Sequence, residues 1–251
     1  MKALVLAGGR GRRMEELSED RNKCLISLRG RPLVEYSLEA ASAIPRISEI
    51  ILLVGYQAES VINRYGIGFN GKKIRYRIQH ERKGLVSAIE TAQPDLDGED
   101  FFLFLGDEII LNGRHDEMID TFYREDAFVV CGVLRQGDPE QIRKTYALIQ
   151  SESGVVYRLI EKPERAVNDL MGTGNCIFKN GIFSYIPKVP LHHIRNEKEL
   201  PDLIQCAIDD GRRVRSFFIS DYYINVNTKT ELENMERSWP DVPSPRGVLR
   251  T

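Results

Sequence analysis

A short apolar run at the N-terminus, which breaks into a loop rich in glycine and arginine, constrains the fold most strongly. Residues 3–7 are apolar, and residues 4–13 have the sequence LVLAGGRGRR. The run predicts a buried strand because it is too short and ends too abruptly for a helix. Glycines permit a tight turn that exposes backbone N–H groups, and arginines supply fixed positive charge with forked donors. We therefore expect a phosphate cradle at a strand's carboxyl end, where open α/β sheets bind ligands.

The loop alone matches the common phosphate-binding fingerprints only in part. Met14 stands where the dinucleotide fingerprint has its third glycine, and the loop lacks the Gly-Lys-Ser/Thr of a P-loop. A strand-to-helix turn with solvated arginines therefore stays open as an alternative at this point.

Composition and charge exclude several classes of protein. The 251 residues suit one α/β domain, and the net charge of −2 provides no global field for nucleic acid or an anionic membrane. Cys24, Cys131, Cys176 and Cys206 form no Cys-x-x-Cys, so we interpret them as reduced thiols of a cytoplasmic protein. The apolar runs are too short to span a bilayer, and we expect no signal peptide.

Strand-like and helix-like patterns alternate along the first half of the chain. The predicted strands are residues 3–7, 49–54, 74–78, 101–105 and 127–133. The predicted helices are residues 33–44, 58–65 and 86–92. This alternation favours a mostly parallel sheet with right-handed crossovers.

The second half of the chain shows weaker periodicity. We expect a hairpin from residues 146–150 and 155–160, further strands at 175–178 and 214–219, and a helix over 199–208. We assign this half to the same sheet and predict one domain over residues 1–236. Several prolines and little apolar periodicity predict an extended tail over residues 237–251.

A second motif follows the loop, in which residues 22–34 have the sequence NKCLISLRGRPLV. Together with LAGGxGxR, this segment resembles the PKxLxxxxGxPLI region of the nucleotidyltransferases that make activated sugars. The resemblance implies that Arg13 and Lys23 contact the nucleotide phosphates. It also implies nucleotide contacts from Leu6, Ala7, Gly8, Gly9, Gly11 and Arg12. Two positions depart from the family pattern, since Arg12 replaces a small hydroxyl residue and Asn22 replaces proline.

A polar segment after a predicted strand resembles the base-reading segment of the glucose-1-phosphate thymidylyltransferases. The shared spacing is Gln-x4-Gly-Leu-x-x-Ala, from Gln79 and Gly84 to Ala88. The resemblance implies that Gln79 and the backbone at Gly84 hydrogen-bond the edge of a pyrimidine. A solvated loop residue stays open as the alternative for Gln79.

Asp107 follows the predicted strand at residues 101–105. A carboxylate at the end of a buried parallel strand is well placed to hold Mg²⁺, although aspartate is also common in strand-end turns. The resemblance implies that Asp107 binds the metal, with Glu108 as a weaker second candidate.

The segment from Tyr223 to Thr228 corresponds to a Trp-x-Asp-x-x-Thr pattern of the family, in which the aspartate is a metal ligand. This chain has Tyr223 and Asn225 at those positions. We predict Asn225 as the second Mg²⁺ ligand and Asn227 as the fallback, because an amide oxygen still binds Mg²⁺ with less charge. A turn-forming pair of asparagines stays open.

Five residues of the second half correspond to the family's acceptor-binding positions. The resemblance implies that Glu161 and Lys162, in an EKP segment, contact the acceptor sugar and its phosphate. Thr173 and Gly174 correspond to a TG segment that lines the acceptor pocket, and Tyr146 to a segment that usually reads Tyr-Gly.

These resemblances span most of the chain and imply a Rossmann-like three-layer α/β sandwich with a mostly parallel mixed sheet, as in the glycosyltransferase-A superfamily. They imply condensation of a nucleoside triphosphate with a sugar 1-phosphate to give an NDP-sugar and pyrophosphate. Arg13, Lys23 and Lys162 are the predicted catalytic residues and Mg²⁺ the predicted cofactor. The expected partners are the two substrates, with no nucleic acid and no membrane. Members of the family are often dimers or tetramers, so the resemblance also allows a homo-oligomer.

Three alternatives remain open at this stage. One is a cytidylyltransferase acting on a non-sugar phosphate or phosphonate. Another is a glycosyltransferase that uses a nucleotide sugar, although the arginine-rich loop and Lys23 argue against it. The last is a catalytically silent nucleotide-binding homologue.

Overall fold

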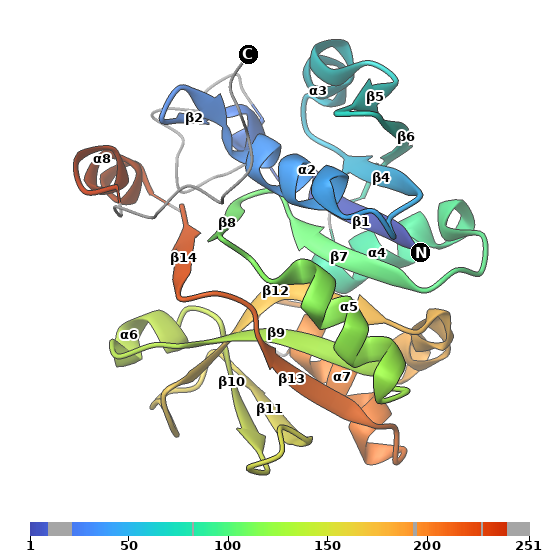
Figure 1. Ribbon diagram of the computed structural model, residues 1–251, viewed down its shortest axis with the longest axis vertical. Helices are drawn as coiled ribbons and strands as arrows, with labels where there is room; N and C mark the ends of the chain where they lie inside the picture. Colours follow the sequence, from blue (N-terminus) through green and yellow to red (C-terminus); the bar gives the residue numbers. More distant parts are fainter. Residues whose placement is uncertain (10–21, 82, 193–194, 227, 240–251) are drawn as a thin grey trace.

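Ten of the described strands form one mixed sheet at the centre of the protein (Figure 1). The computed structural model describes residues 1–9, 22–81, 83–192, 195–226 and 228–239. The strands of this sheet are β1 (Lys2–Ala7), β4 (Glu49–Val54), β5 (Gly68–Phe69), β6 (Lys72–Ile78), β7 (Phe101–Leu105), β9 (Val129–Arg135), β10 (Tyr146–Gln150), β11 (Val156–Glu161), β12 (Leu170–Phe178) and β13 (Val214–Phe218). Their order is β11-β10-β12-β7-β1-β4-β6-β5, with β9 pairing β12 and β13 pairing β9.

The strands β7, β1, β4 and β6 run parallel, as the alternation of strands and helices predicts. Leu4 lies in register with Ile51 on one side and Leu103 on the other. Beyond β7 the sheet is mixed, because β12 pairs β7, β9 and β10 antiparallel whereas β13 pairs β9 in parallel. The register of β12 against β9 shifts between Gly172 and Cys176, and this irregularity lies within the segment that lines the acceptor side.

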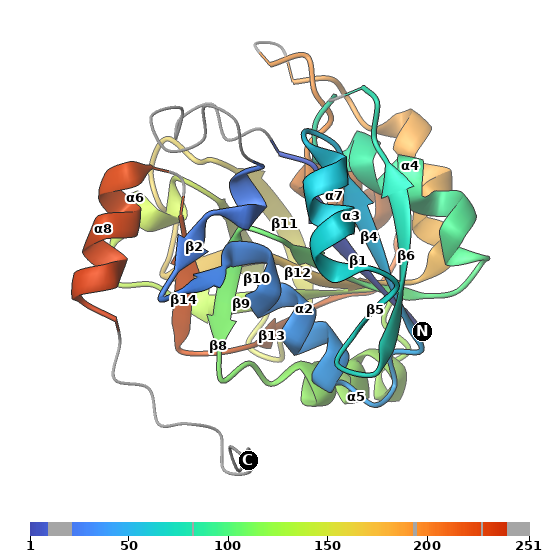
Figure 2. The same cartoon turned by 90° about the horizontal axis from the view of Figure 1, so that it is seen from above.

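Helices cover both faces of the sheet (Figure 2). One face carries α2 (Leu33–Ala43), α3 (Ala58–Tyr65) and α5 (His115–Arg124). The other face carries α4 (Leu85–Leu96), α7 (Leu200–Asp209) and the 3₁₀ segment η3 (Asn180–Lys188). Successive residues of β1 belong to different cores, since Leu4 packs with α4 and Val5 packs with α2. The prediction of an α/β three-layer sandwich with a mixed sheet is confirmed.

A third, smaller cluster lies beside the sheet and was not predicted. It packs apolar residues from the strands β2 (Ser27–Leu28), β8 (Glu108–Leu111) and β14 (Tyr222–Asn225) around Leu33, at the start of α2. The helix α8 (Lys229–Arg237) begins with a capping box of Thr228 and Glu231 and lies near β2 (Figure 1). Trp239 contacts the ring of Tyr36, and residues 240–251 of the predicted tail lie outside the described residues.

The remaining short elements are η2 (Lys23–Leu25), β3 (Arg31–Pro32) and α6 (Pro139–Ile142). Among the described helices, none is long and apolar enough to cross a membrane.

Candidate active site

The backbone after β1 and the backbone after β4 approach each other closely at Gly8 and Gly55, where no larger side chain would fit. A Cβ atom on Gly55 would lie 2.9 Å from the carbonyl oxygen of Gly8, and one on Gly8 would lie 3.2 Å from Oε1 of Gln79. Gly8 therefore lets the end of β1 lie against Gln79. Gly9 is exposed at the end of the described N-terminal segment. Gly11, Arg12 and Arg13 lie outside the described residues, so their roles stay predictions.

Asn22 anchors the segment that carries Lys23. Its side-chain nitrogen donates hydrogen bonds to the carbonyl oxygens of Ala7 (2.9 Å) and Tyr56 (2.7 Å), and its Oδ1 accepts from Cys24 N (2.8 Å). The asparagine is completely buried and caps η2. The departure from proline therefore has a structural explanation, because the side chain of Asn22 binds Lys23's segment to the carboxyl ends of the parallel strands.

Lys23 and Asp107, 84 residues apart in sequence, form an ion pair with 2.5 Å between Nζ and Oδ2. The Lys23 side chain is 8% exposed and that of Asp107 is 30% exposed, so the pair is protected on one side and open on the other. Both residues were predicted from sequence, and the structure brings them together at the end of β7.

Gln79 lies at the end of β6 and is 8% exposed. Its Nε2 has no hydrogen-bond partner among the described residues. A buried donor without a partner costs roughly 1–3 kcal/mol, which a ligand carbonyl at this point would relieve. Gly84 has a φ of +87° at the start of α4, and a Cβ there would lie 2.9 Å from Cβ of Glu197. The backbone at Gly84 thus requires glycine on both conformational and steric grounds.

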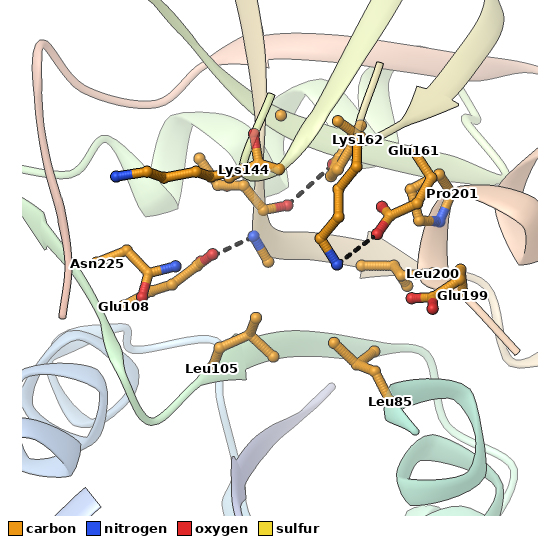
Figure 3. A pocket seen from close by; sticks show the side chains of 15 residues that line it. Leu85, Leu105, Glu108, Lys144, Glu161, Lys162, Glu199, Leu200, Pro201 and Asn225 are labelled. Carbon is orange, nitrogen blue, oxygen red and sulfur yellow. Dashed lines mark hydrogen bonds and ion pairs between the residues drawn. The ribbon is translucent and has the colours of Figure 1, made fainter. Parts of the chain in front are cut away.

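All five residues predicted to bind the acceptor line one cavity of about 170 Å³ (Figure 3). They are Tyr146, Glu161, Lys162, Thr173 and Gly174. Glu161, Lys162 and Glu199 lie on one side of it, and Glu108 and Asn225 lie on the other (Figure 3). The other lining residues are Leu85, Leu105, Lys144, Thr145, Gly172, Leu200 and Pro201.

The charged side of the cavity is held by a local ion-pair network. Lys162 Nζ lies 3.0 Å from Glu161 Oε1, and its backbone N–H donates to Thr145 O at 2.8 Å. Arg195 lies 3.4 Å from Glu161 and 3.0 Å from Glu199. Burial, together with the nearby Glu161 carboxylate, raises the pKa of Glu199. Sequence reasoning missed Arg195 and Glu199, since neither belongs to a motif and both are brought here by tertiary packing.

Tyr146 and Thr173 shape the cavity wall, while their hydroxyls bond within the protein. Tyr146 donates to Thr173 O at 2.9 Å, and Thr173 donates to Gly132 O at 3.0 Å. A Cβ on Gly172 would lie 2.0 Å from the Tyr146 ring, so the tyrosine fits only against glycine. Tyr146 and Thr173 both line the cavity, and their contact with an acceptor stays a prediction.

Glu108 and Asn225 lie opposite each other in the antiparallel β8–β14 pair. Glu108 Oε2 accepts from Gly174 N at 2.8 Å, and Oε1 accepts from the Tyr223 hydroxyl at 2.9 Å. Burial and the nearby Asp107 charge raise the pKa of Glu108 to about 7, against the lowering effect of its hydrogen bonds.

The candidate metal donors are oxygen atoms of Asp107 and Asn225, which is the chemistry that Mg²⁺ prefers. Both carboxylate oxygens of Glu108 already accept hydrogen bonds within the protein. No group of three or more His, Cys, Asp or Glu suited to hold a metal occurs among the described residues. That sparse set still fits Mg²⁺ in phosphate-handling enzymes, which is commonly held by one or two carboxylates plus substrate phosphates. Asn227, the fallback ligand, lies outside the described residues.

The fold and the site together define an open α/β protein with a ligand site at the carboxyl ends of its parallel strands. The chain belongs to the nucleotidyl transferase family, whose model matches residues 2–250. The family predicted from the sequence is confirmed.

Individual relatives are similar to this chain along most of its length. The UTP–glucose-1-phosphate uridylyltransferase AglF of Haloferax volcanii is 28% identical over 94% of this chain and 96% of its own. A glucose-1-phosphate thymidylyltransferase of Streptomyces griseus is 30% identical over 98% of this chain and 68% of its own. A solved UDP-glucose pyrophosphorylase in complex with UDP-glucose has the same fold, with a TM-score of 0.82 at 18% identity over 95% of this chain and 97% of that one.

Proposed function

We propose that this protein condenses a pyrimidine nucleoside triphosphate with a sugar 1-phosphate, giving an NDP-sugar and pyrophosphate. The observation that carries this proposal is the Lys23–Asp107 ion pair. Asn22 connects Lys23 to the end of β1, and Asp107 precedes Glu108, which lines the cavity. The pair therefore links the nucleotide side of the site to the acceptor side.

The chemistry needs positioning and charge stabilisation rather than a covalent enzyme intermediate. An oxygen of the acceptor phosphate attacks the α-phosphorus, and pyrophosphate leaves. Lys23 steadies the α-phosphate, Lys162 holds the acceptor phosphate, and Arg13 is the predicted contact of the departing pyrophosphate. Asp107 and Asn225 would hold Mg²⁺, which when bound supplies positive charge to the phosphates.

The buried Nε2 of Gln79 supports a base that offers a carbonyl oxygen there. Uracil and thymine fit this requirement, and the names of the Haloferax and Streptomyces relatives specify uridylyl and thymidylyl transfer. A site built around such a hydrogen bond discriminates against a base that leaves the donor unpaired. We therefore propose UTP or dTTP as the triphosphate.

The cavity supports a sugar as the acceptor. Carboxylates accept hydrogen bonds from sugar hydroxyls, and both Glu161 and Glu199 line the cavity. Its volume of about 170 Å³ lies below the roughly 300–1,000 Å³ of drug-sized ligand pockets, which favours a single ring. Lys162 supplies the positive charge for the attached phosphate.

A substrate panel tests this proposal. UTP, dTTP, CTP and GTP are each combined with glucose 1-phosphate, N-acetylglucosamine 1-phosphate or phosphocholine, with Mg²⁺, and pyrophosphate release is measured. We expect release from UTP or dTTP with a sugar 1-phosphate. Release only from CTP with phosphocholine would support the non-sugar cytidylyltransferase, and triphosphate binding with no release from any pair would support a silent homologue.

A further inference from the structure

A chain of hydrogen bonds runs from Glu108 through Tyr223 to Asn225. We propose that Glu108 and Tyr223 are positioning residues that orient the amide of Asn225, so that its oxygen faces the metal ion. This inference rests on the proposed function, because it concerns the cation that the transfer requires. Neither residue needs to touch the substrate or the metal to act in this way.

We call the hydrogen-bonded chain Glu108–Tyr223–Asn225 the relay. The register of the two short strands β8 and β14 makes it possible. Glu108 and Asn225 are directly paired in the β8–β14 ribbon, and Tyr223 lies two residues before Asn225 on the same face. The Tyr223 hydroxyl lies 2.9 Å from Glu108 Oε1 and 3.1 Å from Asn225 Nδ2. Glu108 is buried and Tyr223 and Asn225 are half-buried, so the chain of bonds is partly shielded from bulk water.

The direction of each bond follows from what each group is able to donate. When Glu108 is ionised, its Oε2 accepts from the backbone N–H of Gly174, which leaves Oε1 to accept from Tyr223. Because the Tyr223 hydrogen points to Glu108, the phenol oxygen acts as an acceptor toward Asn225. Asn225 must then present its NH₂ group to Tyr223, which turns Oδ1 to the other side of the amide.

The orientation matters because an amide has two unlike ends. A reversed Asn225 would direct N–H dipoles at a cation, whereas a carboxylate has two equivalent oxygens and needs no such control. In the pattern that residues 223–228 resemble, tryptophan and aspartate stand where this chain has Tyr223 and Asn225. Since an indole N–H only donates, a tryptophan at position 223 would not accept a hydrogen bond from the NH₂ group of Asn225. The two departures are therefore mutually consistent.

Two single variants break the relay in different ways. Tyr223→Phe removes the hydroxyl and both of its hydrogen bonds. Glu108→Gln replaces one carboxylate oxygen by an NH₂ group. The N–H of Gly174 requires the remaining oxygen, so the NH₂ group of the glutamine faces Tyr223. The Tyr223 hydrogen then has no acceptor at position 108 and turns to Asn225, which favours the reversed Asn225 amide. Tyr222→Phe is the matched control, since Tyr222 is exposed and adjacent on the opposite face of β14.

The readout is the affinity for Mn²⁺, measured by electron paramagnetic resonance with UTP or with dTTP and no acceptor. We expect Tyr223→Phe and Glu108→Gln each to weaken Mn²⁺ binding by about 10–100-fold, as loss of a partner behind a metal ligand typically does. Tyr222→Phe should bind as the wild type does. In an Asn225→Asp background, Tyr223→Phe should change the affinity by less than about threefold, because the carboxylate has no wrong orientation.

The outcomes separate the relay from the proposed function. If the wild type binds Mn²⁺ and releases pyrophosphate, yet both single variants keep wild-type Mn²⁺ affinity, the relay alone is refuted. An equal loss from Tyr223→Phe in the Asn225 and Asn225→Asp backgrounds also refutes it, since that result indicates a general structural effect. A wild type that neither binds Mn²⁺ nor releases pyrophosphate overturns both the relay and the proposed function.

Discussion

Replacing the buried Glu108 by glutamine should make the metal-free protein more stable at high pH. The raised pKa of Glu108, about 7 against an ordinary 4.5, means that the folded protein keeps this proton where the unfolded chain has released it. Between these two values the folded state binds more protons, so the stability of the wild type falls as pH rises. Glutamine is neutral throughout and lacks this dependence.

The size of the effect follows from the two pKa values. Each pKa unit corresponds to about 1.4 kcal/mol, so the interval from 4.5 to about 7 corresponds to about 3 kcal/mol of unfolding free energy above pH 7. Glutamine still accepts from Gly174 and donates to the Tyr223 oxygen, so the variant leaves these hydrogen bonds satisfied. Glu108→Gln should therefore gain stability relative to the wild type, by up to about 3 kcal/mol, as pH rises from 4.5 to 8.

Urea unfolding of both proteins at several pH values between 4.5 and 8, without metal or nucleotide, measures this difference. Glu90→Gln is the matched control, because Glu90 is exposed on α4 and the same chemical change there leaves the side chain in water. Parallel stability curves for the wild type and Glu108→Gln would refute the reasoning. So would a variant that is less stable than the wild type at pH 8 by a kilocalorie or more.

Three further substitutions have distinct expected effects. Asn22→Ala removes three hydrogen bonds and should lower the free energy of unfolding by about 3 kcal/mol in urea titrations; an unchanged midpoint would contradict the anchoring role. Gln79→Ala should raise the KM for the triphosphate roughly 10–100-fold and reduce base discrimination in steady-state kinetics, whereas unchanged discrimination would remove Gln79 from base reading. Lys162→Met should raise the KM for the acceptor by a similar factor without changing the Kd for the triphosphate; the opposite pattern would place Lys162 on the nucleotide side.

The sequence predicted the elements whose side-chain pattern reflects one local environment. The predicted strand at residues 49–54 matches β4, whose residues are all buried, and the helix over 58–65 matches α3. The prediction missed α8, which has no buried residue and whose only apolar residues are Leu232 and Met235, too few to stand out as a stripe. It also missed the β8–β14 ribbon, because four-residue strands separated by more than a hundred residues leave no local signal.

In the candidate site, too, local sequence patterns were predictable and contacts between distant segments were not. Motifs identified Lys23, Asp107 and Asn225 one at a time, but the ion pair and the relay depend on partners brought close by the fold. Asn22 was interpreted as a departure from the family pattern, and its anchoring role appears only when Ala7 and Tyr56 lie beside it. Spacing in a sequence does not encode such contacts between distant segments.

The initial rate of pyrophosphate release by Lys23→Ala and Asp107→Ala, with the substrate pair identified by the panel, tests the central claim most directly. We expect each variant to lose about 10²–10³ in kcat relative to the wild type, as enzymes do when one preorganised charge at the reacting centre is removed. The ion pair would then be part of the transfer site. If both variants keep kcat within about twofold of the wild type, the assignment of this site to nucleotidyl transfer is wrong.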